Sequence, residues 1–126
     1  LINEGYSVRL VIAEGLSHSE LKEAYKSCDI FVDQLLGGWY GTVAIEAMAF
    51  GKPVVCFIRE SYREYCNYYD AVPIINADPE TIYSVLEELI CSPDKLRDIS
   101  VASRLFVEKY HSESYVMPRL KKYLLG

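Results

Sequence analysis

Short apolar runs alternate with longer amphipathic segments along the chain. Four runs predict β-strands, at residues 8–13, 29–33, 54–58 and 72–75. The run at 54–58 is apolar at every position, which is typical of a parallel strand that is covered on both faces. Strands of this kind separated by helical segments indicate an α/β fold, a parallel sheet with helices on both faces.

Helix signals stand between and after these runs. Ser17 and Glu20 form a capping box ahead of the first helix, and residues 42–50 predict an apolar helix that ends at Gly51. The pairs Asp78-Pro79 and Ser92-Pro93 each predict a helix start. From about 93–125 we expect C-terminal helices divided near His111. Residues 59–70 are polar and tyrosine-rich without a clean period, which predicts a loop or an irregular helix.

The start of the chain resembles the end of a helix. Residues 1–5 have the pattern of a last helical turn, with Gly5 at the left-handed position that closes it, and no Met precedes them. We therefore expect residues 1–126 to form a single, partial, N-terminally truncated domain of a longer protein.

Composition narrows the function classes. The 126 residues are 51% hydrophobic and 25% charged, which is ordinary for a globular domain of one core. The net charge is -5, from 13 basic and 18 acidic residues, and no basic cluster occurs, so we expect no nucleic-acid partner. No run is long enough for a transmembrane segment, and residues 1–5 lack the basic-then-apolar pattern of a signal peptide.

The four cysteines lack the spacing of a metal site or a disulfide framework. They are expected to be reduced thiols in a cytoplasmic protein, with peripheral association with a membrane left open for an intact enzyme. Asp29 and Asp33 lie about 13 Å apart along one predicted strand, too far to share an ion. Because no Asp-x-Asp pair occurs either, we expect neither a metal nor another cofactor.

Ligands of parallel α/β sheets bind beyond the carboxyl ends of the strands. The richest segment at that edge is the turn Gly37-Gly38-Trp39-Tyr40-Gly41-Thr42. Its glycines allow close backbone approach, and the amides that open the next helix suit a diphosphate. The alternative is a tight connection with no ligand. Trp39 and Tyr40 are candidates for stacking on a nucleotide or sugar, or for packing against the domain.

Glu46 is the one ionisable residue in the apolar helix that follows this turn. It lies about 7.5 Å along the helix axis from Gly41 and shares a face with Thr42. A carboxylate there can accept two hydrogen bonds from the vicinal diol of a ribose, while the helix amides hold an attached diphosphate. The alternative is a structural ion pair, for example with Lys52. His18 is likewise a candidate ligand contact or a surface residue of the capping box.

Two segments carry a resemblance to a known family: Asp-Ile-Phe-Val at 29–32 and Gly-Trp-Tyr-Gly-Thr-Val-Ala-Ile-Glu-Ala-Met-Ala-Phe-Gly-Lys-Pro-Val-Val at 38–55. Together they resemble the donor-binding region of the group 1, or family 4, retaining glycosyltransferases. That resemblance implies the C-terminal, Rossmann-like, nucleotide-sugar-binding half of a GT-B enzyme. It implies that the glutamate at 46 binds the ribose and that the turn at 38–42 contacts the diphosphate and the sugar.

Two features depart from the family pattern. The family has a first glutamate eight residues before the second, and here that position is Gly38. The family also often has a glycine pair where this chain has Arg59-Glu60. The cations that neutralise the diphosphate, and the N-terminal acceptor domain, are expected in the part of the protein that precedes this chain.

Three functions remain open from the sequence. The first is sugar transfer from a nucleotide-diphosphate donor to an unknown glycan, lipid or small-molecule acceptor, with the isolated fragment inactive. The second is a nucleotide-sugar epimerase of the same architecture, and the third is a nucleotide- or phosphate-binding module without chemistry. No catalytic residue is assigned. The site residues are Gly38, Trp39, Tyr40, Gly41, Thr42 and Glu46.

Overall fold

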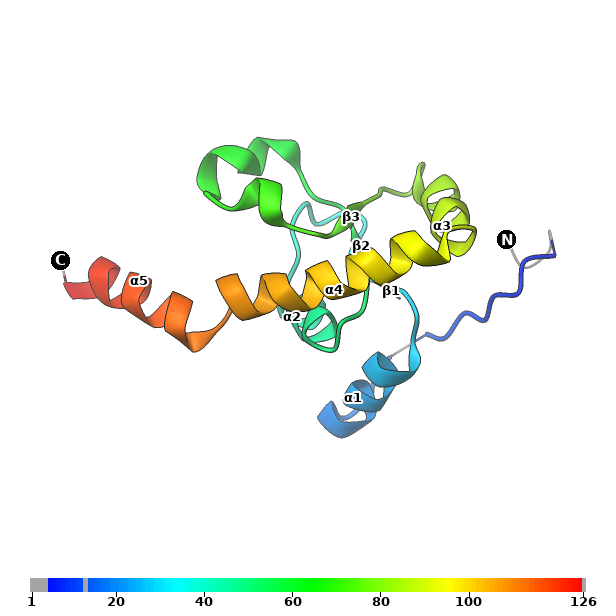
Figure 1. The fold of residues 1–126 in the computed structure, drawn as a ribbon, viewed down its shortest axis with the longest axis horizontal. Coiled ribbons are helices and arrows are strands. Elements are labelled where there is room, and N and C mark those ends of the chain that lie inside the picture. Colours follow the sequence, from blue (N-terminus) through cyan, green and yellow to red (C-terminus); the bar gives the residue numbers. More distant parts are fainter. Residues whose placement is uncertain (1–4, 13, 126) are drawn as a thin grey trace.

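The computed structural model describes residues 5–12 and 14–125 (Figure 1). Within them, short parallel strands alternate with helices, and the C-terminal third is helical. In chain order the elements are α1 (His18–Ser27), β1 (Phe31–Val32), α2 (Thr42–Ala49), β2 (Val54–Cys56), the 3-10 helices η2 (Glu60–Tyr65) and η3 (Tyr69–Ala71), β3 (Ile75–Asn76), α3 (Ile82–Ile90), α4 (Pro93–Tyr110) and α5 (Glu113–Leu125).

The strands form one parallel sheet in the order β1-β2-β3. Phe31 is opposite Val54, and Val55 is opposite Ile75. The centre of the sheet is β2, and its three residues, 54–56, are fully buried. The expected parallel sheet is therefore confirmed, and the all-apolar run at 54–58 contributes its middle strand over residues 54–56.

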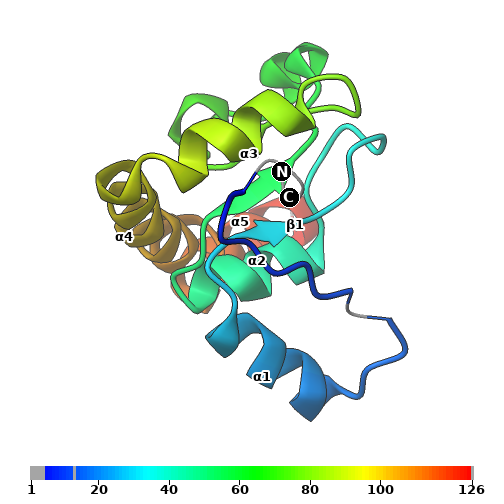
Figure 2. The same cartoon turned by 90° about the vertical axis from the view of Figure 1, so that its right-hand side faces the viewer.

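Side chains of β2 divide the core into two clusters because successive residues of a strand point to opposite faces. Val54 and Cys56 pack with α2 and with Phe106 of α4, whereas Val55 packs with Leu89 of α3. Figure 2 shows α2 and α3 on opposite sides of the strands. Helices thus cover both faces, as the sequence predicted.

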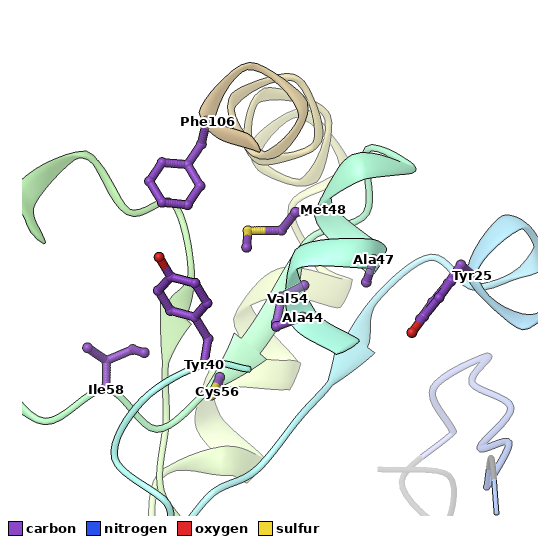
Figure 3. Packing of buried hydrophobic residues seen from close by; sticks show 9 residues of the cluster. All are labelled: Tyr25, Tyr40, Ala44, Ala47, Met48, Val54, Cys56, Ile58 and Phe106. Atoms are coloured by element: carbon purple, nitrogen blue, oxygen red, sulfur yellow. The ribbon is translucent and has the colours of Figure 1, made fainter. Parts of the chain in front are cut away.

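The long helix α4 ties the two clusters together. Leu96 and Ile99 near its start belong with α3, and Phe106 further along packs beside Met48 of α2 (Figure 3). Arg104 donates a hydrogen bond to the carbonyl of Ala49, and so reinforces the contact between α4 and α2.

Most local helix signals are confirmed. Ser17 Oγ accepts a hydrogen bond from the Glu20 amide at the start of α1, and Gly51 ends α2 with φ of +74°. Pro93 opens α4, and the break between α4 and α5 falls at His111. The irregular segment 59–70 contains η2 and the start of η3.

The expected strand at 8–13 is wrong for the residues that the structure describes. Residues 8–12 have no strand partner, and the side chains of Leu10, Val11 and Ile12 are 66–74% exposed. The β-branched pattern gives a preference for extended backbone, but a strand exists only where a neighbour completes its hydrogen bonds. Ala13 and the helical turn expected before Gly5 lie outside the described residues; Gly5 itself has φ of +86°.

Two boundaries also differ from the prediction. The strand expected at 72–75 begins only at Ile75, where the backbone reaches β2 and the Asn76 side chain brackets the backbone of Ile58 with hydrogen bonds of 2.9 and 3.1 Å. The helix expected from Asp78 begins at Ile82, because Asp78 Oδ1 accepts from the amides of Glu80 and Thr81 and so closes a separate turn.

Across residues 5–12 and 14–125, none of the helices combines the length and the apolar character that a membrane crossing requires.

Candidate functional site

The glycine-rich turn follows the carboxyl end of β1 and leads directly into α2. Gly38 is buried and has φ of +85°, a backbone conformation that disfavours any side chain. Its carbonyl accepts a 2.8 Å hydrogen bond from the Arg59 amide, and a Cβ at position 38 would lie 2.8 Å from Arg59 Nε. Gly41 caps α2 and faces open space, with Thr42 exposed beside it.

Tyr40 of this turn is part of the core. Its side chain is 6% exposed and points toward Phe106 (Figure 3). The hydroxyl lies 2.9 Å from His111 Nε2, and burial raises the pKa of Tyr40 well above its usual value. Because the side chain is buried, a ligand bound at the turn can contact Tyr40 only through its backbone.

Trp39 is half-buried and packs at the edge of the same core cluster. Its ring stacks on Tyr40 at 4.9 Å and meets Tyr62 edge-on at 5.8 Å between centroids. It lines a cavity of about 770 Å³ between the segment 62–68 and the start of α5. We call this space the aromatic cavity.

Glu46 lies on the side of α2 that faces α1. Tyr25 Oη donates a 3.0 Å hydrogen bond to Glu46 Oε2. The pKa of Tyr25 is raised, first because the ring is buried and then because its hydroxyl donates a hydrogen bond to the Glu46 carboxylate. No ion pair joins Glu46 to Lys52 in the part of the chain that the structure describes, so the tyrosine takes the place of that expected partner.

The Glu46 carboxylate borders a small hollow of about 250 Å³, which we call the Glu46 pocket. Its wall comes from α1, α2 and the residue after α2, and consists of His18, Lys22, Tyr25, Glu46, Ala49 and Phe50. A carboxylate, an ammonium group and an imidazole at one hollow suit a ligand that carries both hydroxyls and negative charge.

The structure therefore places the predicted site residues on α2 and on the turn before it, but Trp39 and Glu46 border two separate hollows. The Glu46 pocket and the aromatic cavity share no lining residue. Figure 3 shows Tyr25 and Tyr40 on either side of α2. Lys22 was missed as a site residue because an exposed lysine on a helix carries no local signal, and Tyr25 was assigned only to the apolar face of its helix.

A metal centre has no basis in the described residues, since no three His, Cys, Asp or Glu side chains gather closely enough to hold an ion. Cys56 is fully buried, and burial raises the pKa of its thiol to about 11, which suits a core residue rather than a nucleophile.

Comparison with known protein families adds the deciding observation. The family model described as Glycosyl transferases group 1 matches residues 2–106, which is well over half of the chain. This chain belongs to the group 1 glycosyltransferases. The match includes α1, the glycine-rich turn, α2 and the sheet. Membership of this family indicates sugar transfer in general, a reaction that requires a donor and an acceptor.

Two further comparisons gave no relatives, because no curated protein and no solved structure matched this group 1 glycosyltransferase chain.

Proposed function

We propose that this chain is the donor-binding part of a retaining glycosyltransferase of GT-B architecture, and that its ligand is a nucleotide-diphosphate sugar. The backbone of Gly38, Trp39, Tyr40, Gly41 and Thr42 holds the diphosphate, and Glu46 holds the ribose. The observation that carries this proposal is the hydrogen bond of 3.0 Å from Tyr25 to Glu46, which holds the carboxylate at the edge of a hollow.

The physical argument begins at the turn. Gly41 offers an open approach to the first amides of α2, and amides at a helix start attract a phosphate. Glu46 comes later on the same helix, and one of its oxygens already accepts from Tyr25. The remaining lone pairs of the carboxylate can accept both hydroxyls of a ribose diol.

Lys22 adds a positive charge to the same pocket. Departure of a nucleoside diphosphate from the sugar builds negative charge on the leaving group, and fixed cations near that charge lower the barrier. We propose that further cations, and the acceptor-binding domain, belong to the part of the protein outside this chain. The isolated chain is then expected to bind the donor without transferring the sugar.

The main alternative is a nucleotide-binding module without chemistry. It is favoured by one observation, the glycine at position 38, whose φ of +85° is incompatible with the carboxylate that the family places there. Transfer by the full-length protein would exclude this alternative.

The test is a titration of the chain with nucleoside diphosphates and their sugars by calorimetry. Glu46→Ala should weaken the binding of every ribonucleotide by about tenfold, because a hydrogen-bonded charged contact is lost. The matched control is Glu80→Ala, which removes an exposed carboxylate outside both hollows. Unchanged affinity in Glu46→Ala would refute the ribose assignment.

A further inference from the structure

The aromatic cavity is the larger of the two hollows and lies outside the Glu46 pocket. Its volume of about 770 Å³ falls within the range of sites that hold small molecules. Six of its lining residues are aromatic: Trp39, Tyr62, Tyr65, Tyr68, Tyr110 and Tyr115.

Ring contacts hold much of this wall in place before any ligand arrives. Tyr68 stacks on Tyr110 at 4.6 Å, and Tyr115 meets Tyr110 edge-on at 5.2 Å. Trp39 is fixed between Tyr40 and Tyr69, at 4.9 and 6.1 Å. Walls that are already ordered lose little conformational entropy when a ligand binds.

One ring of the wall is conspicuously exposed. Tyr65 lines the cavity with 84% of its surface accessible, and its side chain makes no hydrogen bond or ring contact with another described residue. A large aromatic ring left exposed at the edge of a concave surface is typical of a binding site.

The cavity contains little charge. Among the described residues that line it, Arg119 alone carries a full charge, and its guanidinium lies over the Tyr115 ring at 5.1 Å. The other polar contributions come from tyrosine hydroxyls, Asn67 and His111, which donate and accept hydrogen bonds. The wall therefore suits a neutral ligand with one apolar face and several hydroxyl groups.

We propose that the aromatic cavity binds a neutral sugar ring by stacking. The C–H face of such a ring packs against the tyrosines, and its hydroxyls meet the tyrosine hydroxyls and Asn67. The choice of a sugar rests on the proposed function. Trp39, which lines the cavity, directly follows Gly38, so the cavity adjoins the turn assigned to the diphosphate.

A nucleobase would also stack on aromatic rings, but the proposed function assigns the nucleoside to the side of α2 where Glu46 lies. Its ribose belongs at Glu46, and the Glu46 pocket has no lining residue in common with the aromatic cavity. The sugar itself has two sources, the donor or an acceptor glycan, and the experiment separates them.

The experiment uses the fluorescence of Trp39, which is the single tryptophan of the chain and lines the cavity. Methyl glycosides represent an acceptor, and a nucleotide sugar is compared with its nucleoside diphosphate. The test variant is Tyr65→Ala, which removes a ring that is 84% exposed. The control is Tyr83→Ala, which removes a tyrosine of α3, 42% exposed, that lines neither hollow.

We expect a saturable fluorescence change with glycosides or with the nucleotide sugar. The affinity should fall about tenfold in Tyr65→Ala, because one aromatic contact is lost, and should be unchanged in Tyr83→Ala. A response to glycosides assigns the acceptor, and a response to the nucleotide sugar alone, weakened in Glu46→Ala, assigns the donor sugar. No response to any sugar, or an equal response to the nucleoside diphosphate, overturns the proposal. Binding of nucleoside diphosphates by calorimetry tests the proposed function separately.

Discussion

The Tyr25 hydroxyl donates a 3.0 Å hydrogen bond to Glu46 Oε2 and so joins α1 to α2 across 21 positions of the chain. Tyr25 is 1% exposed and also meets Phe31 edge-on at 5.5 Å. A buried donor holds this carboxylate in one orientation at the pocket. The bond therefore has a structural role and, under the proposed function, orients the group that receives the ribose.

Replacing Tyr25 by Phe removes that donor and leaves the ring. We expect the free energy of unfolding to fall by about 1–3 kcal/mol, because the Glu46 oxygen loses a partner in a partly buried place. Urea denaturation measures the loss. In a Glu46→Ala background, where the acceptor is absent, the same change should cost less, since the two residues form one interaction. Equal costs in both backgrounds would show that the bond contributes nothing specific.

A carboxylate cannot be restored at position 38 without strain. Gly38→Glu places a side chain at φ of +85° and against Arg59 Nε, so we expect a destabilisation of at least about 1–2 kcal/mol. Gly41→Ala is the matched control in the same turn, because its Cβ meets nothing within 4 Å and its φ is -120°. The midpoints of chemical denaturation should separate the two variants, and equal midpoints would contradict the geometry.

Stability should depend on the ionisation of His111. Burial lowers the pKa of His111 from its ordinary 6.5, and the neighbouring groups that face it, Tyr40 and Tyr68, carry no negative charge near neutral pH. A lowered pKa means that the unfolded chain binds the proton more readily. The stability due to neutral His111 is thus complete above pH 6.5 and is lost as the pH falls through the lower, folded value.

Thermal melts between pH 8 and 5 test this dependence. The melting temperature should fall below about pH 6.5, and His111→Gln should reduce that fall. The control is His18→Gln, at an exposed position of α1. A melting curve whose pH dependence is the same in His111→Gln as in the unmodified chain would refute the assignment.

The contact between α2 and α4 should dominate the stability of the core. Phe106→Ala empties a position that is 4% exposed, and we expect a cost of about 3–5 kcal/mol. Leu105→Ala, at the adjacent position with 58% exposure, should change stability by less than about 0.5 kcal/mol. Denaturant titrations of the two variants measure the difference, and comparable losses would place the core elsewhere.

Local signals predicted the elements well, and long-range contacts explain where prediction failed. Ser17 and Pro93 act on the residues beside them, so both helix starts could be read from the sequence. The segment 8–12 has the right residues for a strand but no neighbour, and pairing depends on the rest of the fold. The start of α3 was mispredicted for a more local reason, since the Asp78 side chain closes a separate turn before the helix begins.

The candidate site divides in the same way. The glycine-rich turn and the isolated Glu46 were visible in the sequence because spacing along one helix places them. The partner of Glu46 was not visible, because Tyr25 belongs to a different helix. Nor was the partner of Tyr40, since His111 is 71 positions away. From the sequence, Trp39 and Tyr40 were both candidates either for stacking on a ligand or for packing in the core. Only the tertiary structure shows that Tyr40 is buried while Trp39 lines a cavity.

The central claim is that Glu46 receives the ribose of a nucleoside diphosphate, and one binding cycle tests it most directly. Calorimetry compares a ribonucleoside diphosphate with its 2′,3′-dideoxy form on the unmodified chain and on Glu46→Ala. We predict that loss of the diol weakens binding to the unmodified chain by about tenfold and changes nothing in Glu46→Ala. An equal loss in both proteins would contradict the claim.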